Sequence, residues 1–237
     1  MRLAKPHLDI GLFTADIQAQ GAFWRDDAGL RLDHELELPL SVAPPAAPQA
    51  ERWVQHRFDA HGSVVKVNHW SGELPALPPS GYTALTIARD NPSTWEGWHP
   101  DGGRVRLVPT GTEGVEGIAV TVNTPDPERM MAFYCEAMSF ERLAPRTARC
   151  GDTLLFVQPG DGGGIDEHFI GPGFRYLTMQ VFDADQACES IVERGGRLAR
   201  APFGVGDIAR IGFVQDPDGN WIEISARTSL TGQPPGQ

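Results

Sequence analysis

The sequence is poor in the features that mark secreted and membrane-spanning proteins. It has three cysteines, Cys135, Cys150 and Cys188, and they lack the close spacing of a zinc site. We therefore expect reduced thiols and a cytoplasmic location. Residues 1–7 carry no apolar stretch of the kind found in signal peptides, so no signal peptide is expected. No apolar run is long enough to span a bilayer.

Positive charge is also scarce. The chain has 20 Lys and Arg against 31 Asp and Glu, a net charge of −11, and a pI near 5.0. Such a chain repels phosphate backbones and anionic lipid surfaces. We therefore expect neither nucleic acid nor a membrane as partner, and predict a small-molecule ligand and a monomer or homodimer. The 237 residues suffice for one large or two small domains.

The most informative stretch is residues 211–227, which read as a strand, a tight turn and a second strand. Pro217 and Gly219 are typical turn residues. After the turn, polar and aliphatic residues alternate with the period of a half-buried strand. Glu223 lies four residues after the turn glycine, between two aliphatic residues.

The same turn and strand recur earlier in the chain. Lys66 lies four residues after Gly62, and Arg106 lies four residues after Gly102, each between aliphatic neighbours. A repeated unit indicates a fold built by duplication. The charged residue of each unit is expected to face a cleft.

Helix-start signals accompany the repeats. Asp16, Asp126 and either Asp183 or Asp185 are predicted to cap three helices, and Pro127 suits the first helical position. Each helix lies between a first strand and further strands. The chain is therefore predicted to be α+β, with repeated modules of the order strand, helix and three strands, the second of them trimmed.

The aromatic pair Phe133-Tyr134 on a predicted helix and the segment Asp-Pro-Asp-Gly-Asn at 216–220 resemble the vicinal oxygen chelate superfamily. This superfamily includes glyoxalase I, extradiol dioxygenases and bleomycin resistance proteins. The resemblance implies four βαβββ modules paired into two glyoxalase-like domains, with curled mixed sheets around clefts. We expect the following organisation: an N-terminal domain at 1–110 with modules at about 6–70 and 80–110, a C-terminal domain at 111–227 with modules at about 115–160 and 172–227, and a disordered tail at 228–237.

The resemblance also implies where a metal site would lie, with one ligand in the first strand and a glutamate in the last strand of a module. The last-strand glutamate matches Glu223. The other such positions fall on Tyr176 in the fourth module, Gly117 in the third, Asp9 and Lys66 in the first, and near Thr83 and on Arg106 in the second. A catalytic metal needs about three protein ligands. We therefore expect no cofactor and no metal ligand, although a divalent metal is possible and would then be bound by Glu223.

Glu223 and Tyr176 are the predicted catalytic pair. A carboxylate base beside a phenol can remove a proton next to a carbonyl group and stabilise the enolate. A structural role, as a solvated strand carboxylate and a core tyrosine, is the alternative. Further ligand-binding residues are predicted at Thr178, Gln180, Trp221, Ser225 and His168. A polar cluster is predicted in the N-terminal cleft from Asp9, Lys66, Asn68 and Arg106.

These residues favour a metal-independent protein that binds or converts a small, partly apolar organic molecule in the C-terminal cleft, by lyase or isomerase chemistry. One alternative is a metal-dependent glyoxalase or extradiol-dioxygenase-type enzyme that uses Glu223 and a displaced histidine. Another is a non-catalytic, resistance-type protein that sequesters a small molecule.

Overall fold

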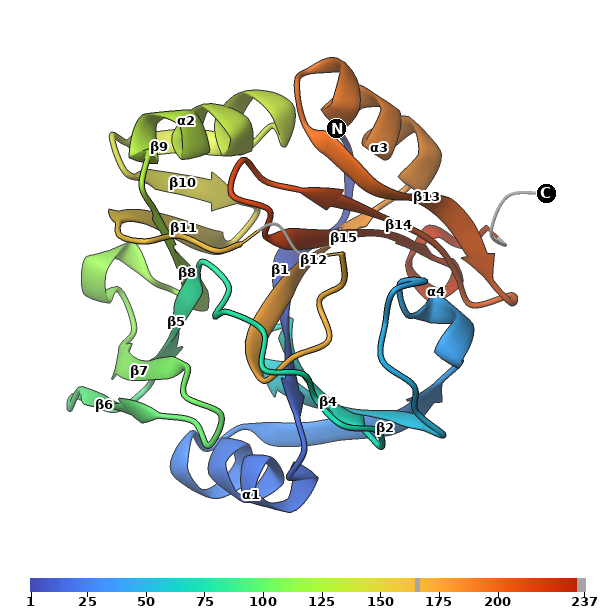
Figure 1. Cartoon of the computed structure of the whole chain (residues 1–237). Coiled ribbons are helices and arrows are strands. Elements are labelled where there is room, and N and C mark those ends of the chain that lie inside the picture. The colour runs from blue at the N-terminus through green and yellow to red at the C-terminus, as the bar shows by residue number, and fades with distance from the viewer. Residues whose placement is uncertain (165–166, 234–237) are drawn as a thin grey trace.

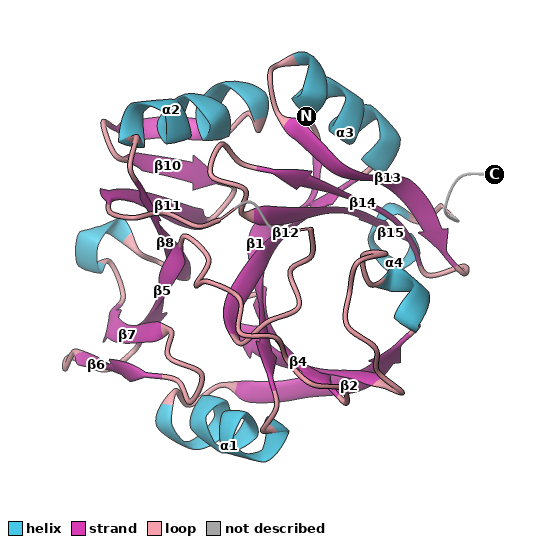
Figure 2. Cartoon of the chain, viewed as in Figure 1, coloured by secondary structure: helices cyan, strands magenta, loops and turns pink. Residues whose placement is uncertain are grey.

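The structure is a computed structural model that describes residues 1–164 and 167–233. Within these residues the strands form two mixed sheets, as Figures 1 and 2 show. The first sheet has the spatial order β13 (Arg197–Val205), β14 (Ala209–Gln215), β15 (Trp221–Arg227), β12 (Gly173–Val181), β1 (Leu3–Thr14), β4 (Ser63–Trp70), β3 (Trp53–Ala60) and β2 (Arg31–Leu38). The second sheet has the order β6 (Trp95–Trp98), β7 (Arg104–Pro109), β5 (Tyr82–Arg89), β8 (Ile118–Thr124), β11 (Thr153–Pro159), β10 (Thr147–Cys150) and β9 (Glu141–Ala144). The α+β prediction is confirmed.

The pairing of the modules differs from the expectation. The first sheet joins the first and fourth modules through the antiparallel strands β1 and β12. The second sheet joins the second and third modules through the antiparallel strands β5 and β8. Both sheets therefore cross the expected boundary between residues 110 and 111. Every module offers a similar free edge on its first strand, so the sequence of one module does not specify its partner. That the two halves fold as separate units stays a prediction.

Capped helices connect the first strand of each large module to the rest of that module. The helical segments are α1 (Ile17–Ala22), η1 (Phe23–Asp27), η2 (Leu40–Val42), η3 (Thr112–Gly114), α2 (Pro127–Ala132), η4 (Phe133–Ala137), α3 (Ala184–Glu193) and α4 (Thr228–Thr231). Asp16, Asp126 and Asp183 each accept hydrogen bonds from backbone N–H groups of the following first turn, which confirms the predicted caps. In Figure 1, α2 and α3 lie side by side, with α1 on the opposite side of the molecule.

The predicted disordered tail is wrong in its first part. Residues 228–231 form α4, because the backbone N–H of Thr228 donates to the Ile208 carbonyl and its hydroxyl donates to the Asp207 carbonyl. These bonds tie the chain end to the turn between β13 and β14. Residues 234–237 lie outside the described part of the chain.

Strand β1 separates the hydrophobic core from the candidate site. Leu8, Ile10 and Leu12 are fully buried in the main core, which contains residues of both sheets and the helices. Each such side chain contributes roughly 1.5–3 kcal/mol when it is removed from water. The alternating residues Asp9 and Gly11 face the other side of the strand. A charged side chain is thus held in the middle of an apolar sheet.

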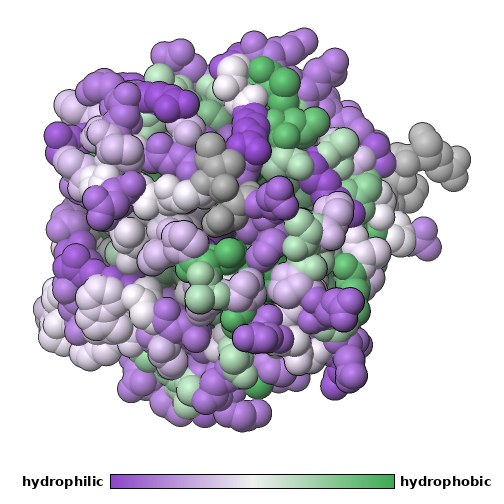
Figure 3. Space-filling model, viewed as in Figure 1, coloured by the Kyte–Doolittle hydropathy of each residue, from purple (hydrophilic) through white to green (hydrophobic). Residues whose placement is uncertain are grey.

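The surface is predominantly polar on the side seen in Figure 3, where hydrophobic residues gather in small, separate groups between hydrophilic ones. No helix within residues 1–164 and 167–233 is long and apolar enough to cross a membrane.

Candidate functional site

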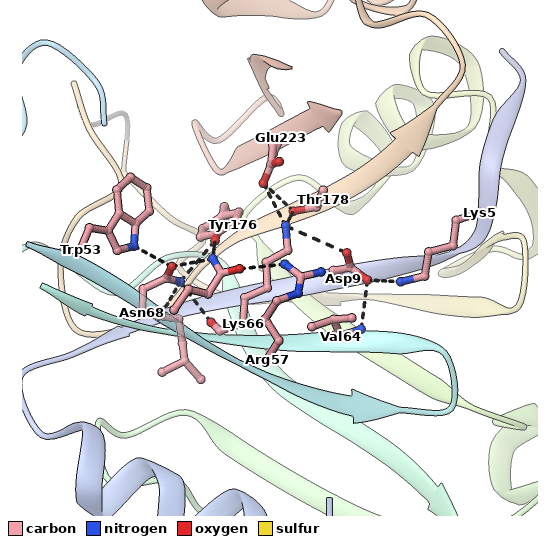
Figure 4. Close-up of polar contacts among 12 residues, drawn as sticks. Lys5, Asp9, Trp53, Arg57, Val64, Lys66, Asn68, Tyr176, Thr178 and Glu223 are labelled. Carbon is pink, nitrogen blue, oxygen red and sulfur yellow. Dashed lines mark hydrogen bonds and ion pairs between the residues drawn. The ribbon is translucent and has the colours of Figure 1, made fainter. Parts of the chain in front are cut away.

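Lys66 lies at the centre of a buried polar cluster between the first and fourth modules. Its Nζ donates to Thr178 Oγ1 at 2.6 Å and to Glu223 Oε2 at 3.0 Å. It also lies 4.0 Å from Asp9 Oδ2. The Thr178 hydroxyl donates to the same oxygen of Glu223 at 2.9 Å. Figure 4 shows the ammonium group pointing at Glu223 and Thr178, with Asp9 beside it.

Asp9 is the fully buried carboxylate of this cluster. Lys5 Nζ donates to its Oδ1 at 2.6 Å, and the backbone N–H of Val64 donates to the same oxygen at 3.0 Å. Burial acts to raise the pKa of Asp9, but the nearby Lys66 and Lys5 ammonium groups outweigh it and hold that pKa below its ordinary value. Burial lowers the pKa of Lys66, and Glu223 and Asp9 oppose this effect.

Tyr176 belongs to an amide network beside the cluster. Its hydroxyl oxygen accepts from Gln55 Nε2 at 3.3 Å and from Asn68 Nδ2 at 3.2 Å. No hydrogen bond joins the Tyr176 hydroxyl to Glu223 in the described part of the chain. Burial, followed by the Glu223 charge, raises the pKa of Tyr176, so the phenol keeps its proton. Its ring packs across Gly11, where a Cβ would overlap the ring.

A small cavity of about 80 Å³ opens beside this network. Its polar wall includes Gln55, Arg57, Lys66, Tyr176, Glu223, Ser225 and Arg227, and its apolar wall includes Val42, Trp53, Phe169, Ile211 and Phe213. The Glu223 side chain is 15% exposed, whereas that of Asp9 is 1% exposed. Glu223 is therefore the carboxylate of the cluster that a ligand can reach.

Strand register shows that Asp9 and Lys66 in the first module hold the same two positions as Tyr176 and Glu223 in the fourth module. Glu223 pairs with Thr178, two residues after Tyr176. Lys66 pairs with Gly11, two residues after Asp9. Because β1 and β12 are antiparallel neighbours, the two pairs face each other across the sheet. The predicted N-terminal polar cluster and the predicted C-terminal catalytic pair are thus parts of one site.

The same register in the second sheet defines the corresponding positions there and corrects one of them. Arg106 pairs with Thr86, so its first-strand counterpart is Ala84, one residue after the expected Thr83. In the third module, Phe156 lies between the core residues Leu155 and Val157, as Lys66 lies between Val65 and Val67. It pairs with Thr121, so the first-strand position is Ala119. The expected position Gly117 was therefore wrong by two residues.

Arg106 does not belong to the cluster, which corrects another prediction. It lies on β7 in the second sheet, where its guanidinium donates to both carboxylate oxygens of Glu113, at 3.1 and 3.2 Å. It faces a larger hollow of about 1150 Å³ between the second and third modules. Arg106 was grouped with Asp9 on the expectation that the first two modules pair.

The other predicted ligand-binding residues separate into two groups. Ser225 lines the cavity, while Gln180 and Trp221 are buried outside its wall. The Trp221 ring packs against Phe169 instead. His168 accepts from the backbone N–H of Ile170, and its neighbour Phe169 supplies the side chain that reaches the cavity.

Sequence reasoning missed Gln55, Arg57 and Arg227. Gln55 and Arg57 alternate with half-buried residues along β3 and are themselves 3% and 6% exposed. Their alternation was a usable signal, but a polar strand face normally indicates solvent. They are buried here because the fourth module covers that face.

The side chains at the four equivalent positions do not fit a divalent metal. Glu223 and Asp9 are two carboxylates, but the Lys66 ammonium lies between them and would repel a cation. Tyr176 supplies a protonated phenol. Across the described ranges, no group of three or more His, Cys, Asp or Glu side chains is arranged to hold a metal ion.

Comparison with known proteins identifies relatives of the C-terminal half. A profile described as Glyoxalase/Bleomycin resistance protein/Dioxygenase superfamily matches residues 117–224. The lactoylglutathione lyase of Escherichia coli O157:H7 is 37% identical over 111 residues, which cover 46% of this chain and 75% of that protein. A probable lactoylglutathione lyase of Synechocystis sp. is 28% identical over 121 residues, covering 46% of this chain and 92% of that protein.

Solved structures extend the likeness in fold to almost the whole chain. Glyoxalase I from Zea mays superposes with a TM-score of 0.68 at 16% identity, covering 98% of this chain and 94% of that one. A putative dioxygenase from Bacillus subtilis gives a TM-score of 0.66 at 12% identity, covering 95% and 86%. Since the E. coli enzyme is matched over three quarters of its length, the chain belongs to the glyoxalase/bleomycin resistance protein/dioxygenase superfamily.

Proposed function

We propose that this chain is a metal-independent glyoxalase-like protein that binds and converts a small, partly apolar organic molecule in the cavity between the first and fourth modules. One observation carries the proposal. The Lys66 ammonium group bonds to Glu223 and approaches Asp9 at the positions where the superfamily resemblance places metal ligands. A fixed positive charge of the chain itself therefore stands where a metal would supply one.

The chemistry that suits this arrangement is proton transfer at a carbon next to a carbonyl group. Glu223 Oε2 accepts from Lys66 and Thr178, and the side chain borders the cavity. The carboxylate is thus held in place to take the proton. The electrons of the broken C–H bond pass into the enolate, whose oxygen is stabilised by nearby donors.

Tyr176 and Lys66 are the donors for that enolate oxygen. The Tyr176 oxygen accepts two amide N–H groups, so its own O–H proton is free to be donated. Lys66 contributes positive charge, 5.5 Å from the Tyr176 ring centre. Return of the proton from Glu223 to a neighbouring atom completes an isomerisation, and loss of a leaving group completes a lyase reaction. The lyase names of the relatives support this class.

The cavity size restricts the ligand. Pockets for drug-sized molecules have volumes of roughly 300–1,000 Å³, and this cavity has about 80 Å³. Its aromatic and aliphatic wall favours a compact, partly apolar molecule. The cavity is also compatible with a protein that sequesters such a molecule without converting it.

The first test is elemental analysis of protein purified without a chelator or a metal-affinity tag. We expect far less than one equivalent of metal per chain. Near-stoichiometric iron, manganese, nickel or zinc would overturn the proposal, because that metal would have to displace Lys66.

The second test separates conversion from binding. Exchange of carbon-bound protons for deuterium is followed by NMR with hydroxyacetone and 2-oxobutanoate as small neutral and anionic ketone probes. The variant Glu223→Gln keeps the shape of the side chain and removes the base. We expect it to lose roughly 10²–10⁴-fold in exchange rate while probe binding is retained. Binding without exchange in the wild type would support the sequestering protein, and an unchanged rate in the variant would exclude Glu223 as the base.

A further inference from the structure

Two arginines of the cavity wall form no ion pair with a carboxylate among the described residues. Arg57 lies on β3 and Arg227 ends β15, so they come from the first and fourth modules. Arg57 is 6% exposed. Its Nη1 donates to Gln55 Oε1 at 2.7 Å, while its buried Nε has no hydrogen-bond partner within residues 1–164 and 167–233. We call these two residues the arginine pair.

The charges of the wall do not cancel at the arginine pair. The wall holds three cations, Lys66, Arg57 and Arg227, and two carboxylates, Glu223 and Glu37. Glu223 bonds to Lys66. Glu37 pairs with the exposed Arg52 at 2.8 Å. Two positive charges are left, and in the described part of the chain no acid lies within ion-pair distance of either arginine.

The two guanidinium groups of the arginine pair repel each other. Burial lowers the pKa of Arg227, and the Arg57 charge lowers it further, although Glu223 and Asp9 act in the opposite direction. Two guanidinium groups that line the same small cavity create a site of positive potential. A bound anion would relieve this repulsion.

We propose that the cavity binds a small monocarboxylate with an apolar or aromatic body, its carboxylate against Arg57 and Arg227. This rests on the proposed function, in that the same cavity is the ligand site. Guanidinium groups match a planar carboxylate with paired N–H donors. The rest of the wall, formed by residues such as Phe169, Ile211 and Phe213, suits the body of the acid.

The same placement brings the acid to the proposed base. Arg57, Arg227 and Glu223 border one small volume, so a carboxylate on the arginine pair puts its neighbouring carbons near Glu223. The chain as a whole carries a net charge of −11 and repels anions. The arginine pair therefore supplies local attraction against that field, and salt is expected to weaken the binding.

The experiment compares matched acids and amides. Affinities of butanoate against butanamide, and of benzoate against benzamide, are measured by NMR titration in a buffer without carboxylate or phosphate. Each pair has nearly the same shape and differs in charge. We expect each acid to bind at least tenfold more tightly than its amide.

Substitution identifies the groups responsible. Arg57→Met and Arg227→Met are each expected to abolish most of the preference for the acid while amide binding persists, which shows that the variant is folded. Arg146→Met is the control, because Arg146 is exposed and does not line the cavity, but its loss changes the net charge equally. Retained preference in both cavity variants, or loss of preference in the control, would overturn the arginine pair as the anion site.

Failure of this inference and failure of the proposed function give different results. Equal binding of acid and amide overturns the anion site and leaves the cavity as a ligand site. Absence of binding by all four probes also overturns the anion site, and the metal analysis and deuterium exchange then decide the proposed function on their own.

Discussion

The two sheets share a strand arrangement but carry different side chains at equivalent positions. In the first sheet, Asp9, Lys66, Tyr176 and Glu223 meet in a closed polar cluster beside a cavity of about 80 Å³. In the second sheet, register places Ala84, Arg106, Ala119 and Phe156 at the corresponding positions, beside a hollow of about 1150 Å³. The backbone frame is the same, so the side chains at a few positions determine whether it encloses a charged site.

Each group of four equivalent positions contains one cation, Lys66 in the first sheet and Arg106 in the second, and their surroundings differ. Lys66 is buried and faces two carboxylates of different modules. Arg106 faces Glu113 and Glu96, whose side chains are 52% and 46% exposed. Water can replace the partners of Arg106 but not those of Lys66. The following predictions test this contrast, beginning with the largest expected effect.

Lys66→Met and Arg106→Met form a matched pair. The first leaves Asp9 and Glu223 buried close together without their shared cation, and we expect it to reduce the free energy of unfolding by about 3–5 kcal/mol. The second removes an ion pair with exposed partners, and we expect a loss of less than about 1 kcal/mol. Urea unfolding followed by circular dichroism measures both. Equal losses would mean that buried Lys66 contributes no more to stability than Arg106 does.

We expect protonation of His99, in the second sheet, to destabilise the folded protein at a higher pH than protonation of Asp9, in the first sheet. His99, in the turn between β6 and β7, has its pKa lowered by burial to about 4. Between this value and the ordinary 6.5, the unfolded chain binds more protons than the folded one. His99 therefore contributes a fall of about 3 kcal/mol in the free energy of unfolding as pH decreases through this window. Buried Asp216, whose pKa is raised to about 7, contributes in the opposite direction.

His99→Gln is expected to remove the His99 contribution, so that the free energy of unfolding, measured by urea unfolding, falls less from pH 6.5 to 4 than in the wild type. Asp9 serves as the contrast, because its pKa is lowered, so the stability it contributes is present above its ordinary value of 3.8 and is lost at still lower pH. An Asp9→Asn variant should keep the slope between pH 6.5 and 4. If the free energy of unfolding changes with pH in His99→Gln as it does in the wild type, the pH dependence must come from another group.

Gly11 lies opposite Tyr176 where β1 pairs with β12. The corresponding residues where β5 pairs with β8 are Thr86 and Ala119. Gly11→Ala should cost about 1–3 kcal/mol, since the new methyl group overlaps the Tyr176 ring. In a Tyr176→Ala background the same substitution should cost much less, because the ring is gone. A double-mutant cycle measures this coupling. Additive effects would show that the ring does not require glycine.

The smallest effect is expected at the arginine pair. Arg227→Met relieves a desolvated charge and its repulsion with Arg57, so the free protein should be unchanged or more stable by up to about 1 kcal/mol. Arg146→Met, at an exposed position, should change stability by less than that. Thermal unfolding of the two variants tests this, and a clear loss of stability in Arg227→Met would assign Arg227 a structural role.

Much of the fold was predictable because its signals are local. The caps at Asp16, Asp126 and Asp183 follow from side chains that bond to the next turn of the same helix. Such patterns depend on residues a few positions apart, and the sequence contains them in full.

The candidate site was predicted in parts and assembled wrongly. Glu223, Tyr176, Asp9 and Lys66 were all identified by position, but they were divided between two clefts. Arg106 was included and Arg57 was omitted for the same reason. Each error follows from pairing the first module with the second, when the hydrogen bonds of β1 go to β12.

The chain sequence alone therefore determined the modules, their caps, the acidic surface charge and the residue types at the equivalent positions. The three-dimensional arrangement decided which modules share a sheet, and with that it decided that Lys66 meets Glu223 across 157 positions of sequence. The physical reason is that similar edge strands can pair in more than one way. The choice among these pairings depends on how well whole faces pack, and no local pattern encodes that.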